Sequence, residues 1–183
     1  MNLVISFAVI AIIAAIWTIS KQRKLMTVNK NINNIMSRIG AHLSSGFDAV
    51  NTLLNLAKGH SVHESQSLIE TVKSRRGVIT AASTPDDVLV QERMLSEVLG
   101  RISMLAEKYP SLKTDENYSK HLQTAHNCKK EVYSSRLIYN DNIAKLNREI
   151  CAFPTSLLAG FFGFRKREYL ESAEEKFDIN GIR

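Results

Sequence analysis

Hydrophobic positions divide the chain into one uninterrupted apolar run and a series of amphipathic segments. Residues 3–19 are almost entirely apolar, and the first charged side chain is Lys21. As a helix, such a run would extend about 26 Å, close to the ~30 Å hydrocarbon core of a bilayer. A helix also satisfies its backbone hydrogen bonds internally, as a water-free bilayer core requires. The run therefore predicts a transmembrane anchor over residues 1–20.

After the anchor, apolar residues recur every three or four positions, which is the repeat of an amphipathic helix and close to that of a coiled-coil seam. Stop and start signals divide this pattern. Gly59 follows the first segment, Thr84 and Pro85 begin the third, and Pro110 and Pro154 end the third and fourth. We expect long helices over about 25–57, 63–82, 85–109 and 115–153.

Short connections between these segments favour antiparallel neighbours. The sequence therefore predicts an all-α fold, in which the transmembrane helix is followed by an antiparallel up-down four-helix bundle over residues 21–153. With this topology the fourth helix returns toward the membrane. Residues 154–183 are expected to form an apolar and basic C-terminal segment and a tail.

The order of charges distinguishes an anchor from a cleaved signal peptide. A signal peptide carries its basic residues before the apolar core, whereas here Lys21, Arg23 and Lys24 follow it. Trp17 lies near the same end, where an interfacial indole is expected. By the positive-inside rule we expect a single-pass protein of the cell (inner) membrane, with a short external N-terminus and a cytoplasmic body.

Charge and cysteine content narrow the choice of function. The chain has 24 Lys and Arg and 18 Asp and Glu, well mixed in sign. Because no long basic block occurs, we do not expect nucleic-acid binding. On one helix Cys128 and Cys151 would lie about 34 Å apart, too far for a disulfide within the chain.

The C-terminal segment 155–167 permits two interpretations. Five large apolar residues precede three basic ones: Leu157, Leu158, Phe161, Phe162, Phe164, Arg165, Lys166 and Arg167. Such a segment can insert into the interface of an anionic membrane. Alternatively, the apolar side chains cap the open end of the bundle core.

Two blocks of the sequence are similar to a known family. The chain resembles the LemA family in Tyr139-Asn140-Asp141, Asn147, Phe153-Pro154 and residues 157–164, and in residues 109–113 with Glu116-Asn117-Tyr118. The order of apolar N-terminus, long helix and two motifs is similar over the whole chain. The resemblance implies a single-pass bacterial membrane protein with a mostly cytoplasmic helical bundle, and no established activity.

The first helix departs from the family pattern. The family carries a basic pair before Asp-Leu and then Pro-Asn-Leu. Here Asp48 is followed by Ala49, and Asn51-Thr52-Leu53 replaces the step that contains proline. The resemblance is therefore carried mainly by the second half of the chain.

Candidate chemistry is sparse. His60 and His63 are three residues apart, and His121 and His126 are five apart, but no acidic cluster accompanies either pair. The sequence contains no nucleophile elbow, phosphate loop or dinucleotide turn. We therefore expect no catalytic residues, no metal and no cofactor.

Arg136 is the most informative single residue, because it lies on the predicted seam of the fourth helix. A buried guanidinium needs a partner, for which Asp48 and Glu70 are candidates by type. Alternatively, its methylenes cover the edge of the core and its charge reaches water. We expect Asp48, Arg136, Tyr139 and Asn140 to form a buried polar or partner-binding patch, to which Asp141 and Asn147 are neighbours. The alternative for the polar residues is a solvated face.

These observations support a membrane-anchored binding or scaffold protein as the leading hypothesis. Its expected partners are the bilayer and a protein at the cytoplasmic face, and a homo-oligomer is compatible with the pattern. The alternative is a lipid- or envelope-responsive module that uses residues 155–167. A third hypothesis is a hydrolase with a site between helices, which would require a polar concave pocket.

Overall fold

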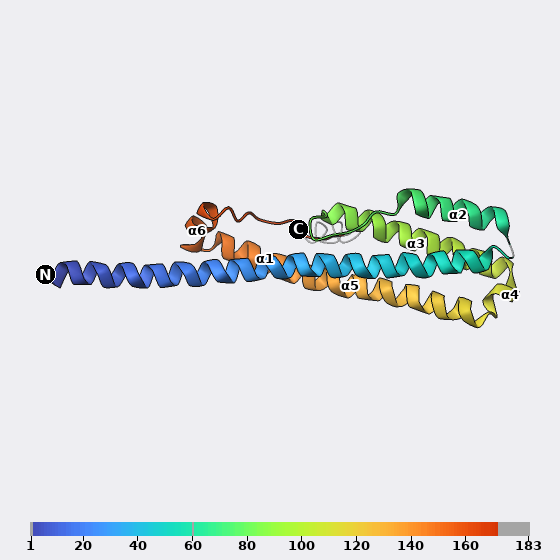
Figure 1. Ribbon diagram of the computed structural model, residues 1–183, viewed down its shortest axis with the longest axis horizontal. Helices are drawn as coiled ribbons and strands as arrows, with labels where there is room; N and C mark the ends of the chain where they lie inside the picture. The colour runs from blue at the N-terminus through green and yellow to red at the C-terminus, as the bar shows by residue number, and fades with distance from the viewer. Residues whose placement is uncertain (1, 60, 172–183) are drawn as a thin grey trace, which may run out of the picture.

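A single helix runs through the length of the molecule. The computed structural model describes residues 2–59 and 61–171, and its first helix, α1 (Asn2–Ala57), is unbroken from the apolar N-terminal segment to the far end (Figure 1). At 1.5 Å per residue it is about 84 Å long. The prediction of an all-α chain with a long apolar N-terminal helix is confirmed, since the described ranges contain helices and no strand.

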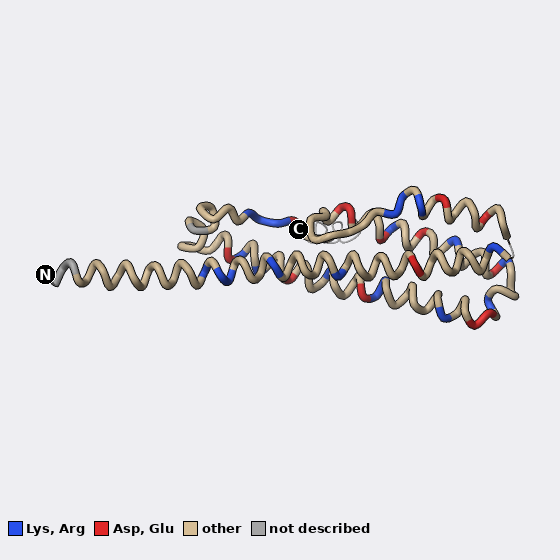
Figure 2. Tube along the Cα trace, in the orientation of Figure 1, with Lys and Arg blue, Asp and Glu red and all other residues tan. Residues whose placement is uncertain are grey.

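The two parts of α1 have different surroundings. The Ile and Val side chains and Phe7 between Ile5 and Ile19 are at least half exposed, whereas Leu25 is 2% exposed and begins the buried stripe. By length and composition this helix is able to cross a membrane. Figure 2 shows that its N-terminal part carries no charged residue before the basic cluster that starts at Lys21.

The other helices are arranged around α1. Helix α5 (Glu116–Cys151) lies along it and runs back toward the N-terminal side, while α3 (Pro85–Lys108) and the shorter α2 (Val62–Arg75) pack on its distal part (Figure 1). A single turn, α4 (Pro110–Lys113), joins α3 to α5, and α6 (Thr155–Phe161) follows α5. The predicted seams of α1, α3 and α5 supply most of the core, including Ile39, Leu53, Leu95, Ile102 and Ile143.

The second helix is shorter than predicted. It ends at Arg75 rather than Ala82. The backbone groups around this end form hydrogen bonds with the side chain of Gln91 in α3 instead of continuing the helix. The Gly77 N–H donates to Gln91 Oε1 at 2.9 Å, and Gln91 Nε2 donates to the Arg75 carbonyl at 3.1 Å. The chain then crosses to α3 with Ile79 buried against α1.

This crossing explains a glycine on α1. A Cβ built on Gly40 would overlap the carbonyl of Ile79, so the crossing backbone occupies the space that any larger residue would need. At Gly46 a Cβ would lie 2.9 Å from Leu95 Cδ2 and 3.4 Å from Cys128 Cβ, where α1, α3 and α5 meet. Both positions therefore permit close packing on α1.

The predicted start of a helix near residue 25 is not a boundary, since α1 runs on from the apolar segment, and the remaining boundaries lie within two residues of those predicted. Helix α3 begins with a capping box, in which the Thr84 side chain accepts from Asp87 N–H and the Asp87 carboxylate accepts from Thr84 N–H. Helix α5 begins at Glu116 with Asp115 as its N-cap and ends at Cys151. The division into an anchor, a bundle and a C-terminal segment stays a prediction, and the tail over 172–183 and His60 lie outside the described residues.

Candidate functional site

The C-terminal chain forms a strap along the body. After α6, residues 164–171 form neither helix nor strand and run back toward the middle of the molecule (Figure 1). We call these residues the strap. They contact Asn33 of α1 and three residues of α5, Arg136, Asn140 and Asn147. We call these four contact residues the strap groove.

Two asparagines bind the backbone of the strap. Asn147 Oδ1 accepts from the Arg167 N–H at 2.9 Å, and its Nδ2 donates to the Arg167 carbonyl at 2.9 Å. Asn140 makes the same pair of bonds with Leu170, at 2.8 and 3.1 Å. A carboxamide offers a donor and an acceptor side by side, and thus satisfies both backbone groups of one extended residue.

The spacing of these bonds fits the geometry of the two segments. Asn140 and Asn147 are two helical turns apart, about 10.5 Å along the same face of α5. Arg167 and Leu170 are three residues apart, which in an extended chain is about 9–10 Å. A seven-residue helical repeat can therefore bind every third residue of an extended chain that runs in the opposite direction.

Side chains add two anchors to this backbone recognition. Leu170 is 0% exposed and joins the hydrophobic core, while Arg167 Nη1 donates to Asn33 Oδ1 at 2.8 Å. Arg136 is buried and links the strap to α3, since its Nη2 donates to the Leu170 carbonyl at 3.5 Å and its Nη1 lies 3.2 Å from Glu92 Oε2. The strap groove thus binds mainly the backbone of the strap, and it also contacts one aliphatic and one basic side chain.

The predicted polar patch is only partly assembled. Tyr139 is buried, which raises the pKa of its hydroxyl, and Asn140 binds the strap rather than solvent. Asp48 lies elsewhere and pairs with Arg76 at 2.8 Å. Asp141 forms an exposed ion pair with Lys145 at 2.6 Å.

Among the described residues the acidic partner of Arg136 is Glu92, so the predicted partners Asp48 and Glu70 are wrong. Sequence reasoning missed Glu92 and Asn33. The sequence did contain one indication of Glu92. Between Val88 and Leu95 the apolar stripe of α3 has polar residues, Gln91 and Glu92, at the positions where an apolar residue is expected.

The N-terminal side of the body carries the predicted membrane flank. Lys21 Nζ lies 5.9 Å from the centre of the Trp17 ring and 3.4 Å from Glu149 Oε2. Lys24 Nζ lies 2.5 Å from Glu149 Oε1, and this hydrogen bond is the main cause that lowers the pKa of the Glu149 carboxyl. Arg23 stays exposed. The end of α5 is thereby fixed beside the basic residues that follow the apolar run.

Segment 155–167 combines features of both predicted alternatives. Leu157 and Phe161 are 70% and 85% exposed, as is neighbouring Phe153 at 84%, so these side chains do not cap the core. Phe164 packs against the core together with buried Ala159, and half-buried Phe162 makes an edge contact with Phe161. The side chain of Leu158 lies outside the described part of the chain.

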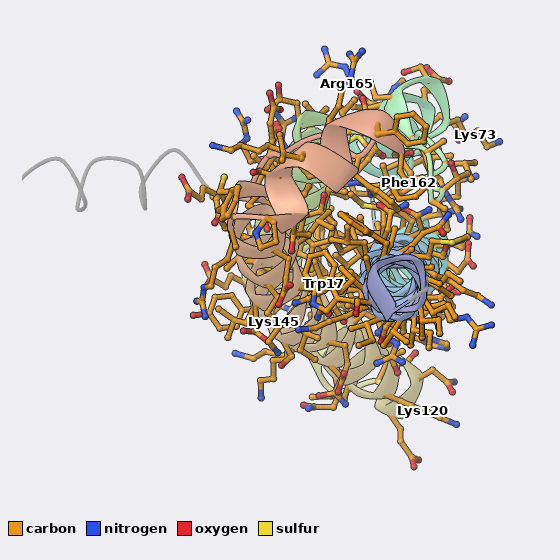
Figure 3. All side chains as sticks on the ribbon, turned by 90° about the vertical axis from the view of Figure 1, so that its left-hand side faces the viewer. Trp17, Lys73, Lys120, Lys145, Phe162 and Arg165 are labelled. Atoms are coloured by element: carbon orange, nitrogen blue, oxygen red, sulfur yellow. The ribbon has the colours of Figure 1, made fainter. Side chains whose placement is uncertain are left out.

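The basic residues of this segment divide in the same way. Arg165 and Lys166 are exposed, and Arg165 points away from the helices in the view from the N-terminal side (Figure 3). Arg167 is half-buried in the strap groove. Figure 2 shows this basic run at the same side of the body as the cluster that begins at Lys21.

A concave region lies between α2 and α3. It is a cavity of about 480 Å³ lined by His63, Glu64, Ser67, Leu68, Arg101, Met104, Leu105 and Lys108. Glu64 pairs with Lys108 at 3.0 Å, which lowers the pKa of the carboxyl and raises that of the amine. Arg101 pairs with Glu97 at 2.7 Å. Among the described residues, no group of three or more His, Cys, Asp or Glu could hold a metal ion.

Comparison with known sequences identifies a protein family. The sequence model of the LemA family matches residues 35–180, a range that includes α2 to α6, the strap and most of the part of α1 that follows the apolar run. No curated protein matches the chain.

Proposed function

The chain belongs to the LemA family, and from this premise we propose that it is a membrane-anchored binding or scaffold protein. The apolar part of α1 crosses the cell membrane, the short N-terminus lies outside, and the helical body presents a surface to another protein at the cytoplasmic face. In this proposal α1, α2, α3 and α5 form an antiparallel four-helix bundle, and the protein catalyses no reaction.

The continuity of α1 is the observation that carries the proposal. The same helix holds exposed apolar side chains up to Ile19 and core side chains from Leu25 onward. The apolar part has no protein to pack against within the described residues, whereas a bilayer would cover it. The basic cluster at Lys21, Arg23 and Lys24 supports a cytoplasmic body by the positive-inside rule.

The ion pair in the α2–α3 cavity argues against a role for Glu64 as a general acid or base. Its acidic group, Glu64, is ion-paired with Lys108, and the hydrogen bond favours the ionised carboxylate. A general acid or base needs a pKa close to the working pH, and this pairing moves the carboxyl away from that range.

Reporter fusions test the orientation. A reporter fused after Arg183 should be active only on the cytoplasmic side, and replacing Lys21, Arg23 and Lys24 with glutamine should reduce that preference. An external signal from the parent chain would contradict the proposed orientation. Crosslinking in intact membranes should recover a protein partner above background, and recovery of none would contradict the binding role.

The exposed face of the C-terminal segment favours a second candidate, a module that also senses lipid. Phe153, Leu157 and Phe161 expose their side chains at the end of the body where α1 emerges from its apolar part. Large apolar side chains beside exposed Arg165 and Lys166 are typical of an interfacial segment on anionic lipid.

Fluorescence quenching tests this candidate. In a chain with Trp17→Phe, a single tryptophan is introduced by Phe161→Trp, or by Tyr133→Trp as a control on an exposed part of α5. In nanodiscs that contain brominated anionic lipid, the tryptophan at 161 should be quenched strongly and the one at 133 should not. Equal quenching at the two positions would remove the lipid-sensing candidate.

A further inference from the structure

We propose that the strap groove is a binding site for an extended segment of a partner protein, and that the strap is the chain's own competing ligand for it. The inference rests on the proposed binding function and names its site. The partner segment carries a basic residue followed, three residues later, by leucine or a similar aliphatic residue.

The chemistry of the groove supports a segment of this kind. Asn140 and Asn147 make four hydrogen bonds, and all four are to backbone N–H and carbonyl groups of the strap. Backbone bonds of this type are available to any extended peptide, as in strand-addition modes of recognition. Arg136 adds a donor to the Leu170 carbonyl, which every residue also has.

Within residues 167–170 of the strap, two side chains contact the groove or the core beside it. Leu170 is enclosed in the core and Arg167 donates to Asn33, while the intervening Glu168 and Tyr169 are exposed. Exposed side chains between the anchors place little restriction on sequence. A partner therefore has to match a pattern of basic residue, two variable residues and aliphatic residue.

The strap is built to be released without disrupting the helices. It belongs to no helix, and within the described chain its one fully enclosed side chain is Leu170. Segments with few buried apolar contacts open locally at much lower cost than core helices. The strap is also tethered next to its site, which gives it an effective concentration of about millimolar. A free segment competes with it only weakly until the strap is loosened.

A peptide-binding experiment on the full-length chain in nanodiscs tests the inference. The probe is a fluorescein-labelled peptide of residues 164–171, and binding is measured by fluorescence anisotropy. Leu170→Ala removes the enclosed side chain of the strap and leaves the groove intact. This variant should bind the peptide at least tenfold more tightly than the parent chain, because its internal competitor is weaker.

Matched substitutions on α5 identify the groove. Adding Asn140→Ala and Asn147→Ala to the Leu170→Ala chain should reduce peptide affinity at least tenfold. Asn142→Ala is the control on the same helix, since the Asn142 amide donates only to the Ile138 carbonyl of α5, and it should leave affinity unchanged. A peptide in which alanine replaces its leucine should bind at least tenfold more weakly.

Three results would overturn the inference. The first is equal peptide affinity for the parent chain and the Leu170→Ala chain. The second is peptide binding that is insensitive to the changes at Asn140 and Asn147. The third is concentration-dependent self-association that those two changes abolish, because it would assign the groove to the strap of a second copy.

Two further measurements keep the test decisive. If circular dichroism shows that Leu170→Ala lowers the helical content, Arg167→Ala is used in its place. Arg167→Ala removes the hydrogen bond to Asn33 and keeps Leu170 in the core. We then expect a severalfold gain in affinity for the peptide. Membrane crosslinking that recovers the same partner from the Asn140→Ala, Asn147→Ala chain overturns this inference and leaves the binding function standing. Recovery of no partner from any chain contradicts the binding function itself.

Discussion

Replacing Gly40 with alanine should destabilise the protein, although alanine is the better helix former. In an exposed helix this change gains about 1 kcal/mol. At Gly40, however, the new Cβ would overlap the Ile79 carbonyl, which belongs to the backbone that crosses from α2 to α3. Inserting a methyl group into a packed site costs about 1–3 kcal/mol.

The cost should fall in the upper part of that range, because the crossing segment cannot move away freely. Gln91 holds its start through bonds to Gly77 N–H and the Arg75 carbonyl, and Ile79 is itself buried. After subtracting the helix-propensity gain, we expect a net loss of about 1–2 kcal/mol. For a chain of this size each kcal/mol lowers the melting temperature by about 2–4 °C.

Gly100→Ala provides the matched control. Gly100 lies inside α3, is exposed, and has nothing within 4 Å of a built Cβ. Only the propensity term applies there, so this variant should gain about 0.5–1 kcal/mol. Thermal melts followed by circular dichroism in the same detergent should therefore move in opposite directions for the two variants. A Gly40→Ala chain that is stabilised as much as Gly100→Ala would show that the crossing segment does not lie against α1.

Three further changes test other contacts. Arg136→Met should lower the melting temperature by removing the cation from the largely buried Glu92, a loss of about 2 kcal/mol or more; an unchanged or higher value would show that the ion pair is not required. Glu149→Gln should lower the free energy of unfolding at pH 7 by less than about 1 kcal/mol. The Lys24 hydrogen bond holds the pKa of Glu149 below its ordinary 4.5, so its contribution is complete above that pH and is lost as pH falls through the lower folded-state pKa. Urea titrations of this variant and the parent should therefore converge in strong acid, and a difference that persists there would refute the assignment. Thr84→Ala removes the capping box of α3 and should cost about 1 kcal/mol in the same titrations, whereas no loss would show that the cap is dispensable.

Helical periodicity was sufficient to locate α1, α3 and α5, because each buries a stripe at a regular spacing. Side chains such as Ile39, Leu95 and Ile143 follow from that repeat alone. Prolines and capping residues then placed most ends within two residues. These signals are local, and a local pattern determines a helix that has a whole face to bury.

The end of α2 could not be predicted in the same way. Residues 78–82 are compatible with a helix, and what stops it is the carboxamide of Gln91, which comes from another helix. The contact between Gly40 and the Ile79 backbone likewise depends on how the helices pack, and the local sequence does not predict it. Arg76 and Gly77 weaken the helical pattern at this point, but tertiary contacts decided the boundary.

The strap was the largest omission. Leu170 is a single apolar residue among charged ones, so it has no periodicity to reveal its burial. The family resemblance singled out Asn140 and Asn147 without giving them a role. Their seven-residue spacing on one face of α5 was visible, but only the position of residues 164–171 shows that they bind backbone.

The unbroken course of α1 also makes it a lever. From Lys21 to Ala57 it extends about 55 Å beyond the apolar part, with no proline or kink to absorb a change of angle. If the apolar part tilts by about 10° when bilayer thickness changes, the far end of the body sweeps sideways by about 10 Å. A partner held at that end would then be moved by the physical state of the membrane, without any signal passing through a ligand.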